Sequence, residues 1–307
     1  MAGWTQGPTP DSVAELLRSL ELTINRRLDG VLHGNHQGIT PGHGSEPGES
    51  RPYQPGDDVR RIDWNVTART GETYVREQVA DHDLTGWLVV DASAAMRFGT
   101  VADDKASTAL AAAACVGFLT ARNRNRLGAI VVAGPHLQVL PPRSGGNQVR
   151  AVLTTIAGAP DVEGQGHSDL VAALDRVGSV ARRRGFVAVI SDFSGPGWSD
   201  PLTRLGQRHD LLAVTVHDPR EYDLPEIGMV AFQDPATGQL HEYRITTDVR
   251  EKFAAAAAEK RSERVDQLGR SGADVIELRT DGDWLGEIVQ HVTRRRVQAV
   301  HGGVLPR

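Results

Sequence analysis

From about residue 84 onward, short apolar runs alternate with longer segments whose apolar residues recur every three or four positions. The apolar runs predict strands at Trp87–Val90, Leu127–Val132, Phe186–Ile190, Leu211–Val216 and Asp274–Leu278. The segments between and after them predict helices at Asp103–Thr120, Asn147–Ile156, Ser168–Val180, Pro201–Leu205, Val249–Leu268 and Trp284–Arg294. Strands that alternate with helices in this way indicate an α/β fold with a mainly parallel sheet and helices on both of its faces.

Two stretches depart from this alternation. The turn "DPATG" separates Met229–Gln233 from Leu240–Ile245 and predicts a β-hairpin. Before residue 81, a helix at Asp11–Arg27 precedes a Gly/Pro-rich stretch, residues 29–50, which predicts irregular structure. A charged segment follows, in which Thr73–Val75 predicts a strand. We therefore expect a lead-in over residues 1–80 and an α/β domain over residues 81–300.

Composition excludes several classes of protein. The 307 residues include 39% apolar residues, enough for a sizeable core, and a single cysteine, which rules out an internal disulfide. A net charge of −5 offers no general attraction to nucleic acid or to an anionic membrane. No apolar run approaches the roughly 20 residues of a membrane-spanning helix, and the first residues lack a signal-peptide pattern. These features predict a cytoplasmic protein without membrane insertion.

Two of the predicted strands end in an acid. Trp87–Val90 runs into Asp91, with Ser93 two residues later, and Phe186–Ile190 runs into Ser191 and Asp192. Ligands of open α/β sheets bind outside the carboxyl ends of the strands, and the loop before Ser168 could bring its hydroxyl to the same edge. Asp91, Ser93, Ser168 and Asp192 would then offer two carboxylates and two hydroxyls, a ligand set suited to Mg²⁺ or Mn²⁺. The alternative is that these side chains only cap the helices that follow them.

The charged segment "RPYQPGDDVRRIDWNVTARTGETYVRE", residues 51–77, is open to two interpretations. Its acids Asp57, Asp58 and Asp63 are interleaved with bases that include Arg60, Arg61 and Arg69, and Trp64 stands among them. The acids could form a catalytic cluster. Alternatively, acids and arginines form a lattice of ion pairs that docks the segment on the main domain, which suits the planar, bidentate guanidinium group.

Familiar catalytic patterns are missing. The sequence has no Gly-rich phosphate loop followed by lysine, and Ser191 lacks the flanking glycines of a nucleophile elbow. An aspartyl nucleophile at Asp91 would need a nearby acid to protonate the leaving group, but positions 93 and 95 are serine and alanine.

Three quoted stretches carry a resemblance to a known family. The charged segment, "WLVVDASAAMRFG" and "VAVISDF" together resemble the bacterial family called domain of unknown function 58, in an actinobacterial branch, from about Leu28 to Arg296. That family contains a von Willebrand factor A-like domain. The resemblance implies a Rossmann-like sheet with a metal-ion-dependent adhesion site at its edge. In that motif Asp91, Ser93, Ser168 and Asp192 match ligand positions, whereas Ala95 replaces a serine, so the site is degenerate.

The resemblance also implies a function. Members of the family resemble accessory proteins that work beside MoxR-type AAA+ ATPases in the maturation or remodelling of other proteins, so we expect a non-enzymatic adaptor whose client is unknown. One alternative is a metal-dependent hydrolase that uses Asp57, Asp58 or Asp63 with Asp91. A third is a purely structural protein whose metal site is inactive.

Overall fold

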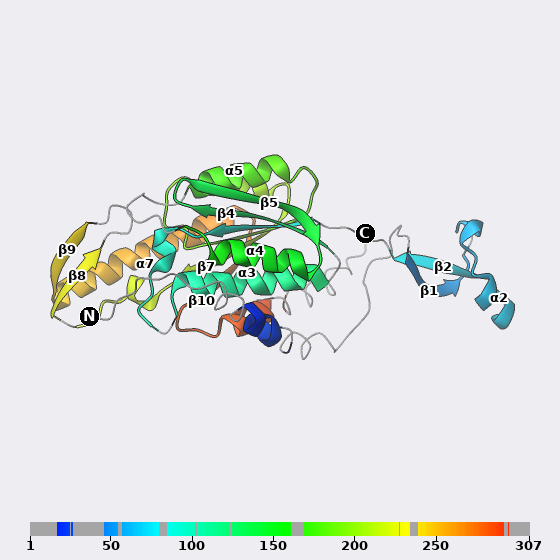
Figure 1. The fold of residues 1–307 in the computed structure, drawn as a ribbon, viewed down its shortest axis with the longest axis horizontal. Helices are drawn as coiled ribbons and strands as arrows, with labels where there is room; N and C mark the ends of the chain where they lie inside the picture. Colours follow the sequence, from blue (N-terminus) through cyan, green and yellow to red (C-terminus); the bar gives the residue numbers. More distant parts are fainter. Residues whose placement is uncertain are drawn as a thin grey trace. The chain divides into compact units, whose positions relative to one another are not determined.

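The computed structural model describes most of the chain, which forms two compact units. The described residues are 17–24, 26, 46–54, 57–79, 85–101, 103–122, 125–160, 169–226, 228–233, 239–291 and 294. The smaller unit comprises residues 29–83, and the larger unit comprises residues 1–28 and 84–307 (Figure 1). The division near residue 83 lies close to the expected boundary, but the N-terminal helical residues group with the larger unit and not with the charged segment.

A six-stranded sheet forms the centre of the larger unit. Its strands follow the order β10-β7-β6-β3-β4-β5. Their bounds are β3 (Thr85–Asp91), β4 (Arg126–Ala133), β5 (His136–Ser144), β6 (Phe186–Ser191), β7 (Asp210–His217) and β10 (Asp274–Arg279). All neighbours are parallel except β4 and β5, which are antiparallel. This is the order of a doubly wound, Rossmann-like sheet with an antiparallel edge strand. The predicted α/β class is confirmed.

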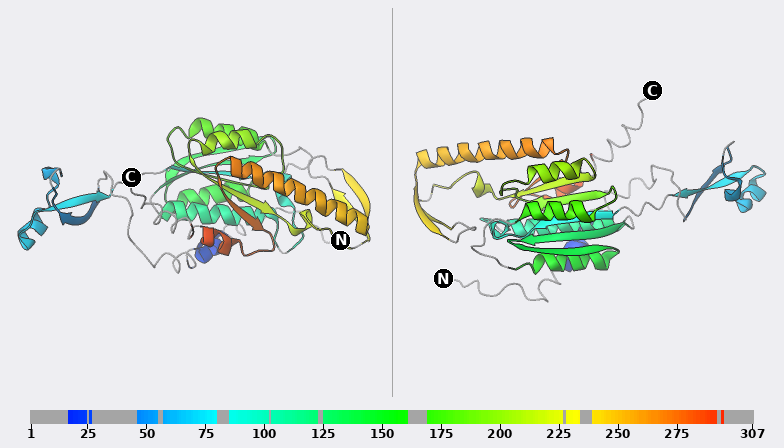
Figure 2. Two further views of the ribbon diagram at one scale, coloured as in Figure 1. Left: turned by 180° about the vertical axis from the view of Figure 1, so that it is seen from behind. Right: turned by 90° about the horizontal axis from the view of Figure 1, so that it is seen from above.

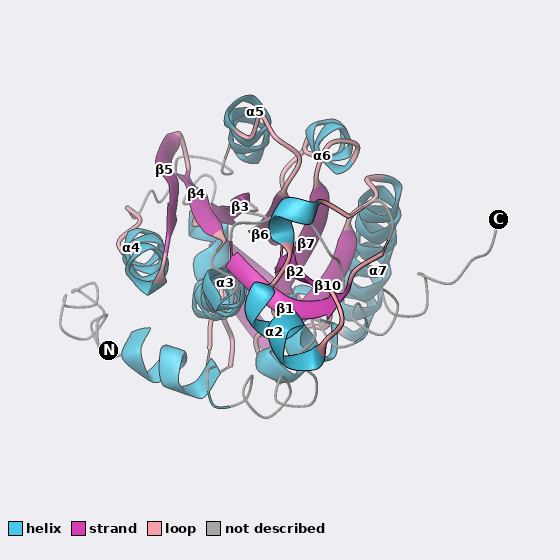
Figure 3. Cartoon of the chain, turned by 90° about the vertical axis from the view of Figure 1, so that its right-hand side faces the viewer, coloured by secondary structure: helices cyan, strands magenta, loops and turns pink. Residues whose placement is uncertain are grey.

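Helices cover both faces of this sheet (Figure 3). One face carries α3 (Lys105–Arg122) and α4 (Gly146–Ala157), and the other carries α5 (Leu170–Val180), α6 (Ser199–Gly206) and the C-terminal end of α7 (Thr247–Arg270). Residues 284–291 are also helical. No helix in the described part of the chain has the length and apolar character needed to cross a bilayer.

The alternation of side chains along β3 explains why both faces need covering. Trp87 and Val89 lie in the core cluster that contains residues of α5, α6 and α7. Leu88 and Val90 point to the opposite face and are fully buried. Since successive strand residues face opposite sides, an unbroken apolar run such as "WLVV" is stable only in a sheet buried on both faces.

The predicted hairpin is present beside the N-terminal end of α7 (Figure 2). It consists of β8 (Gly228–Gln233) and β9 (Leu240–Ile245), which pair antiparallel. The helical residues near the N-terminus are joined to α4 by an exposed ion pair between Glu21 and Arg150.

The smaller unit contains more regular structure than the sequence predicts. Its strands β1 (Glu46–Pro52) and β2 (Tyr74–Val79) form an antiparallel pair, with the short 3-10 helix η1 (Val59–Arg61) and helix α2 (Trp64–Thr70) between them. The expectation of irregular structure up to residue 50 is therefore wrong from Glu46 onward. Helix α2 was also not predicted, although its sequence signals exist: Asp63 caps its start, and Gly71, with a φ of 76°, ends it.

Candidate functional site

The carboxyl edge of the sheet has a switch point between β3 and β6. These strands are parallel neighbours, with Val90 opposite Ile190. From β3 the chain proceeds to β4 on one side, and from β6 it proceeds to β7 on the other. Asp91, the last residue of β3, and Asp192, which directly follows β6, therefore meet at one place, where ligands of doubly wound folds bind.

Asp91 is buried at this switch point, with only 4% of its surface exposed. The Ser191 hydroxyl donates to Asp91 Oδ2 at 2.8 Å, and the backbone N–H of Ser93 donates to Oδ1 at 2.9 Å. Burial, together with the neighbouring charge of Asp192, raises the pKa of Asp91 above its ordinary value, against the hydrogen bonds from Ser93 and Ser191.

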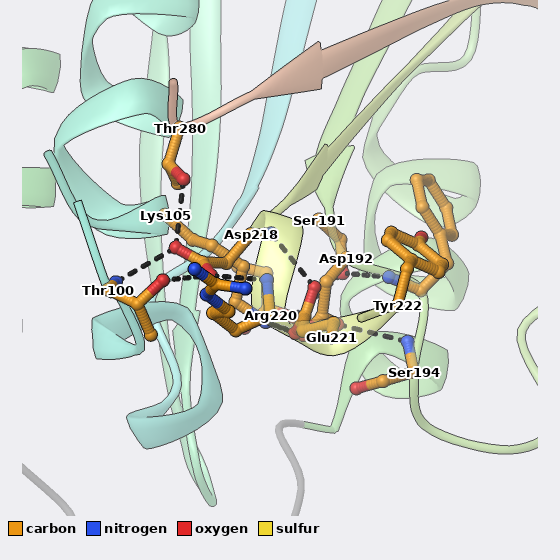
Figure 4. A network of polar contacts seen from close by, with 12 residues as sticks. Thr100, Lys105, Ser191, Asp192, Ser194, Asp218, Arg220, Glu221, Tyr222 and Thr280 are labelled. Atoms are coloured by element: carbon orange, nitrogen blue, oxygen red, sulfur yellow. Dashed lines mark hydrogen bonds and ion pairs between the residues drawn. The ribbon is translucent and has the colours of Figure 1, made fainter. Parts of the chain in front are cut away.

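Asp192 is bound to a buried lysine that sequence reasoning missed (Figure 4). Lys105, the first residue of α3, is 1% exposed. Its Nζ lies 2.7 Å from Asp192 Oδ2 and 2.5 Å from Glu221 Oε1 of the 3-10 helix η3 (Pro219–Glu221). Burial alone would raise the pKa of Asp192, but the Lys105 charge and hydrogen bond hold it below its ordinary value. Burial would likewise lower the pKa of Lys105, but the two carboxylates raise it.

A third acid, Asp218, follows β7 at the same edge. It is fully buried and accepts hydrogen bonds from the backbone N–H and the hydroxyl of Thr100, at 2.9 and 2.6 Å. It also accepts from the Arg220 backbone N–H and the Thr280 hydroxyl, both at 2.9 Å. Asp218 thus ties the β3–α3 loop to η3 and to the residue after β10.

The loop after Asp192 forms one wall of a cavity of about 550 Å³. Phe193 adopts a left-handed backbone conformation, with a φ of 51°, and its carbonyl accepts from the indole N–H of Trp198 at 3.1 Å. Arg264 of α7 lines the cavity and donates to the Asp192 carbonyl and to the Tyr222 hydroxyl, each at 2.7 Å.

Three of the four residues predicted as metal ligands lie in the described chain, and the structure brings them together. Asp91, Ser93 and Asp192 are all at least 96% buried at the switch point. Ser168 lies outside the described residues. Asp169, and not Ser168, is the N-cap of α5. Its carboxylate accepts a hydrogen bond from the Ala172 backbone N–H at 2.8 Å.

The described residues are a poor fit to a divalent cation. Mg²⁺ needs about six oxygen ligands in near-octahedral geometry, but position 95 is alanine and Asp192 already holds the Lys105 ammonium. A metal ion bound to Asp192 would lie beside a full positive charge and be repelled by it. Within the part of the chain that the structure describes, no group of three or more His, Cys, Asp or Glu side chains is arranged to hold a metal.

The predicted residues of the charged segment lie in the smaller unit, where its acids bind nearby backbone groups. Asp58 accepts from the Arg60 N–H and caps η1, and Asp63 accepts from the N–H groups of the first turn of α2. Asp57 accepts from the backbone N–H of Gln54 at 2.8 Å. Arg60 and Arg69 are exposed, and Trp64 is 70% exposed; the side chain of Arg61 is outside the described part.

Two residues of the site, Asp218 and Lys105, are not among the predicted ones, and they differ in how far the sequence indicates them. Asp218 directly follows the apolar run "LLAVTVH", so it could have been recognised as a third strand-ending acid. Lys105 gives no such signal, because its partners Asp192 and Glu221 are 87 and 116 positions away. A lysine at a helix start is ordinarily solvent-exposed.

Comparisons with known proteins identify the family. An uncharacterized protein of Mycobacterium tuberculosis is 47% identical over 291 residues, which cover 94% of this chain and 92% of that protein. Among solved structures, the hypothetical protein BatB from Bacteroides thetaiotaomicron covers 69% of this chain and 98% of its own (15% identity, TM-score 0.43). The SpRpn10 VWA domain covers 68% of this chain and 94% of its own (9% identity, TM-score 0.38). The family model described as protein of unknown function DUF58 matches residues 49–263. The chain belongs to this family.

Proposed function

We propose that the chain is a non-catalytic protein-interaction module that binds a partner protein at the carboxyl edge of its large sheet. We define the docking edge as residues 92–101 after β3, which include the short 3-10 helix η2 (Ala94–Arg97), and the loop of residues 194–197 after β6. The observation that supports this proposal is the position of these loops at the switch point, where α/β folds bind their ligands.

Exposed apolar side chains on the docking edge support a protein as the ligand. Phe98 is 40% exposed and Val101 is 44% exposed, and both belong to the loop between β3 and α3. The backbone of this loop is held in place, since Thr100 donates two hydrogen bonds to Asp218. A large aromatic side chain on an ordered loop is a typical anchor for a partner, because little conformational entropy is lost when it becomes buried.

For the partner we propose a MoxR-type AAA+ ATPase, with the chain acting as its adaptor in protein maturation or remodelling. This step rests on the family resemblance and not on geometry. The smaller unit offers a second contact surface, since Trp64 and Val59 are 70% and 61% exposed.

The alternative of a metal-dependent hydrolase has less support. Asp57, Asp58 and Asp63 accept hydrogen bonds from backbone groups of their own unit. Asp91 accepts from Ser93 and Ser191, so its oxygens already have donors. A hydrolase would need carboxylates able to bind metal or water, and turnover of a phosphoester with Mn²⁺ by the purified chain would favour it.

The test is a pull-down from the organism's own lysate with three versions of the full chain. Wild type is compared with Phe98→Asp, which places a charge on the docking edge. The matched control is Met229→Asp, a similarly exposed apolar residue (58%) on the β8–β9 hairpin. We expect wild type and the control to recover a AAA+ ATPase, and Phe98→Asp to recover roughly tenfold less. Equal recovery by all three would place the contact elsewhere, and no ATPase with any of them would refute the proposed partner.

A further inference from the structure

Lys105, the first residue of α3, lies beside the docking edge, where a cation would be expected to join the loops. Its ammonium group reaches from α3 to Asp192 after β6 and to Glu221 after β7, so it links segments that follow three neighbouring strands. The side chain of Lys105 is 2% exposed and that of Asp192 is 5% exposed. A buried amine is stable only when it is paired and hydrogen-bonded, which these two short contacts achieve.

The charges around Lys105 match those that a bound cation would neutralise. Asp91, Asp192 and Glu221 contribute three carboxylates, and Lys105 is the cation in contact with two of them. Arg264 approaches from α7, but it donates to the backbone carbonyl of Asp192 and not to its carboxylate. The ammonium therefore pairs with two of these carboxylates and links the segments that carry them.

An ammonium differs from a metal ion in one functional respect. It binds through N–H donors and has no open coordination position, whereas a metal can complete its shell with a carboxylate from another protein. The Phe98 ring lies 6.0 Å from Lys105 Nζ, so the exposed surface above the amine is partly aromatic. A partner at this edge would be recognised by apolar contact and hydrogen bonding and not by coordination.

We propose that the Lys105 ammonium is a built-in replacement for the divalent cation, so that the docking edge is preformed without metal. The proposal rests on the site of the proposed function, but its test does not depend on whether a partner binds there. An AAA+ ATPase needs Mg²⁺ for its own nucleotide, so a pull-down with a chelator would confuse the two. The metal test therefore uses the chain alone.

The experiment measures Mn²⁺ binding by electron paramagnetic resonance, and thermal unfolding with chelator or with millimolar Mn²⁺. It compares full-length wild type with Lys105→Met, which keeps an unbranched side chain one atom shorter and removes its charge. The matched control is Lys252→Met, because Lys252 makes a 2.8 Å ion pair with Asp248 whose two side chains are 76% and 71% exposed. Both variants lose one positive charge, but only the first leaves a buried carboxylate, that of Asp192, without its cationic partner.

We expect wild type and Lys252→Met to bind no Mn²⁺ at millimolar concentration and to unfold at the same temperature in both buffers. Lys105→Met should unfold about 10 °C lower in chelator, because Asp192 and Glu221 lose their partner. Mn²⁺ should recover part of this loss, since a ligand that binds only the folded state stabilises it. Adding Ala95→Ser to Lys105→Met supplies a further oxygen and should tighten Mn²⁺ binding roughly tenfold.

Stoichiometric Mn²⁺ binding by wild type would overturn the proposal. A folded Lys105→Met that binds no Mn²⁺ would also overturn it, because the vacated carboxylates would then not form a cation site. If Lys105→Met does not fold in either buffer, the titration of wild type with Mn²⁺ tests the proposal by itself. Binding of Mn²⁺ by wild type would refute the proposal, and no binding would support it.

Discussion

Removing the Asp218 carboxylate should loosen the whole carboxyl edge of the sheet. Asp218 is fully buried and accepts four hydrogen bonds, two from Thr100 and one each from Arg220 and Thr280. In Asp218→Ala all four donors lose their acceptor. Each hydrogen bond to a charged group contributes about 1.5–3 kcal/mol, but the variant also avoids burying a charge. We therefore expect the free energy of unfolding to fall by about 3–5 kcal/mol.

The assay is urea denaturation followed by tryptophan fluorescence. Trp87 and Trp198 are each 4% exposed in the larger unit, so their emission reports its unfolding. The control is Asp223→Ala: the Asp223 side chain is 63% exposed, and its ion pairs with Arg220 and Arg250 span 3.7 and 3.5 Å. Exposed pairs of this kind contribute about 0–1 kcal/mol.

The pH dependence gives an independent check on Asp218. Burial raises its pKa, but the hydrogen bonds from Thr100, Arg220 and Thr280 outweigh burial and hold the pKa below its ordinary value. A carboxyl group with a lowered pKa contributes stability at neutral pH that is lost as pH falls from about 4 through the folded-state pKa. In Asp218→Ala this contribution is absent, so its free energy of unfolding should decrease less than that of wild type over this pH range. A loss of stability no larger than that of Asp223→Ala would refute the assigned role.

Three further substitutions test the packing and the electrostatics of the larger unit. Gly185→Ala would place its Cβ 2.4 Å from the backbone oxygen of Thr85, so it should lower the free energy of unfolding in urea by about 1–3 kcal/mol. Gly146→Ala, where a Cβ meets open space, should be neutral or stabilising; equal effects would contradict the predicted clash. Burial, aided by nearby arginines, lowers the pKa of His217 to about 4, so stability is full above pH 6.5 and falls as pH drops from there to about 4. His217→Phe keeps a ring against Tyr222 and should lose less stability than wild type between pH 7 and pH 5, and an unchanged pH slope would refute the assignment.

The charged segment shows where local sequence signals were present but were read incompletely. Asp58 and Asp63 are followed by the helices they cap, and Gly71 ends α2. Caps are local, because the carboxylate binds N–H groups two or three residues away. The alternating charges predicted catalytic acids or ion pairs, and the same acids also carry a local capping pattern that predicts η1 and α2.

The sequence by itself determined the α/β class and the strand-ending acids of the larger unit. Apolar runs such as "WLVVD" and "VAVISD" encode buried strands locally, since every residue of such a run must be covered. The rule that parallel strands present their carboxyl ends at one edge then predicted Asp91 and Asp192 at the same edge of the sheet. These inferences needed only periodicity within about ten residues and a general property of parallel sheets.

Only the tertiary structure decided what those acids bind. The order β10-β7-β6-β3-β4-β5 makes β3 and β6 neighbours across 100 residues of chain, which lets Ser191 donate to Asp91. The same order brings Lys105 to Asp192 and Glu221. Nothing near Lys105 in the sequence distinguishes it from a solvated lysine at a helix start. Its burial follows from contacts between distant segments, and the energy of a buried charge depends on those contacts rather than on local pattern.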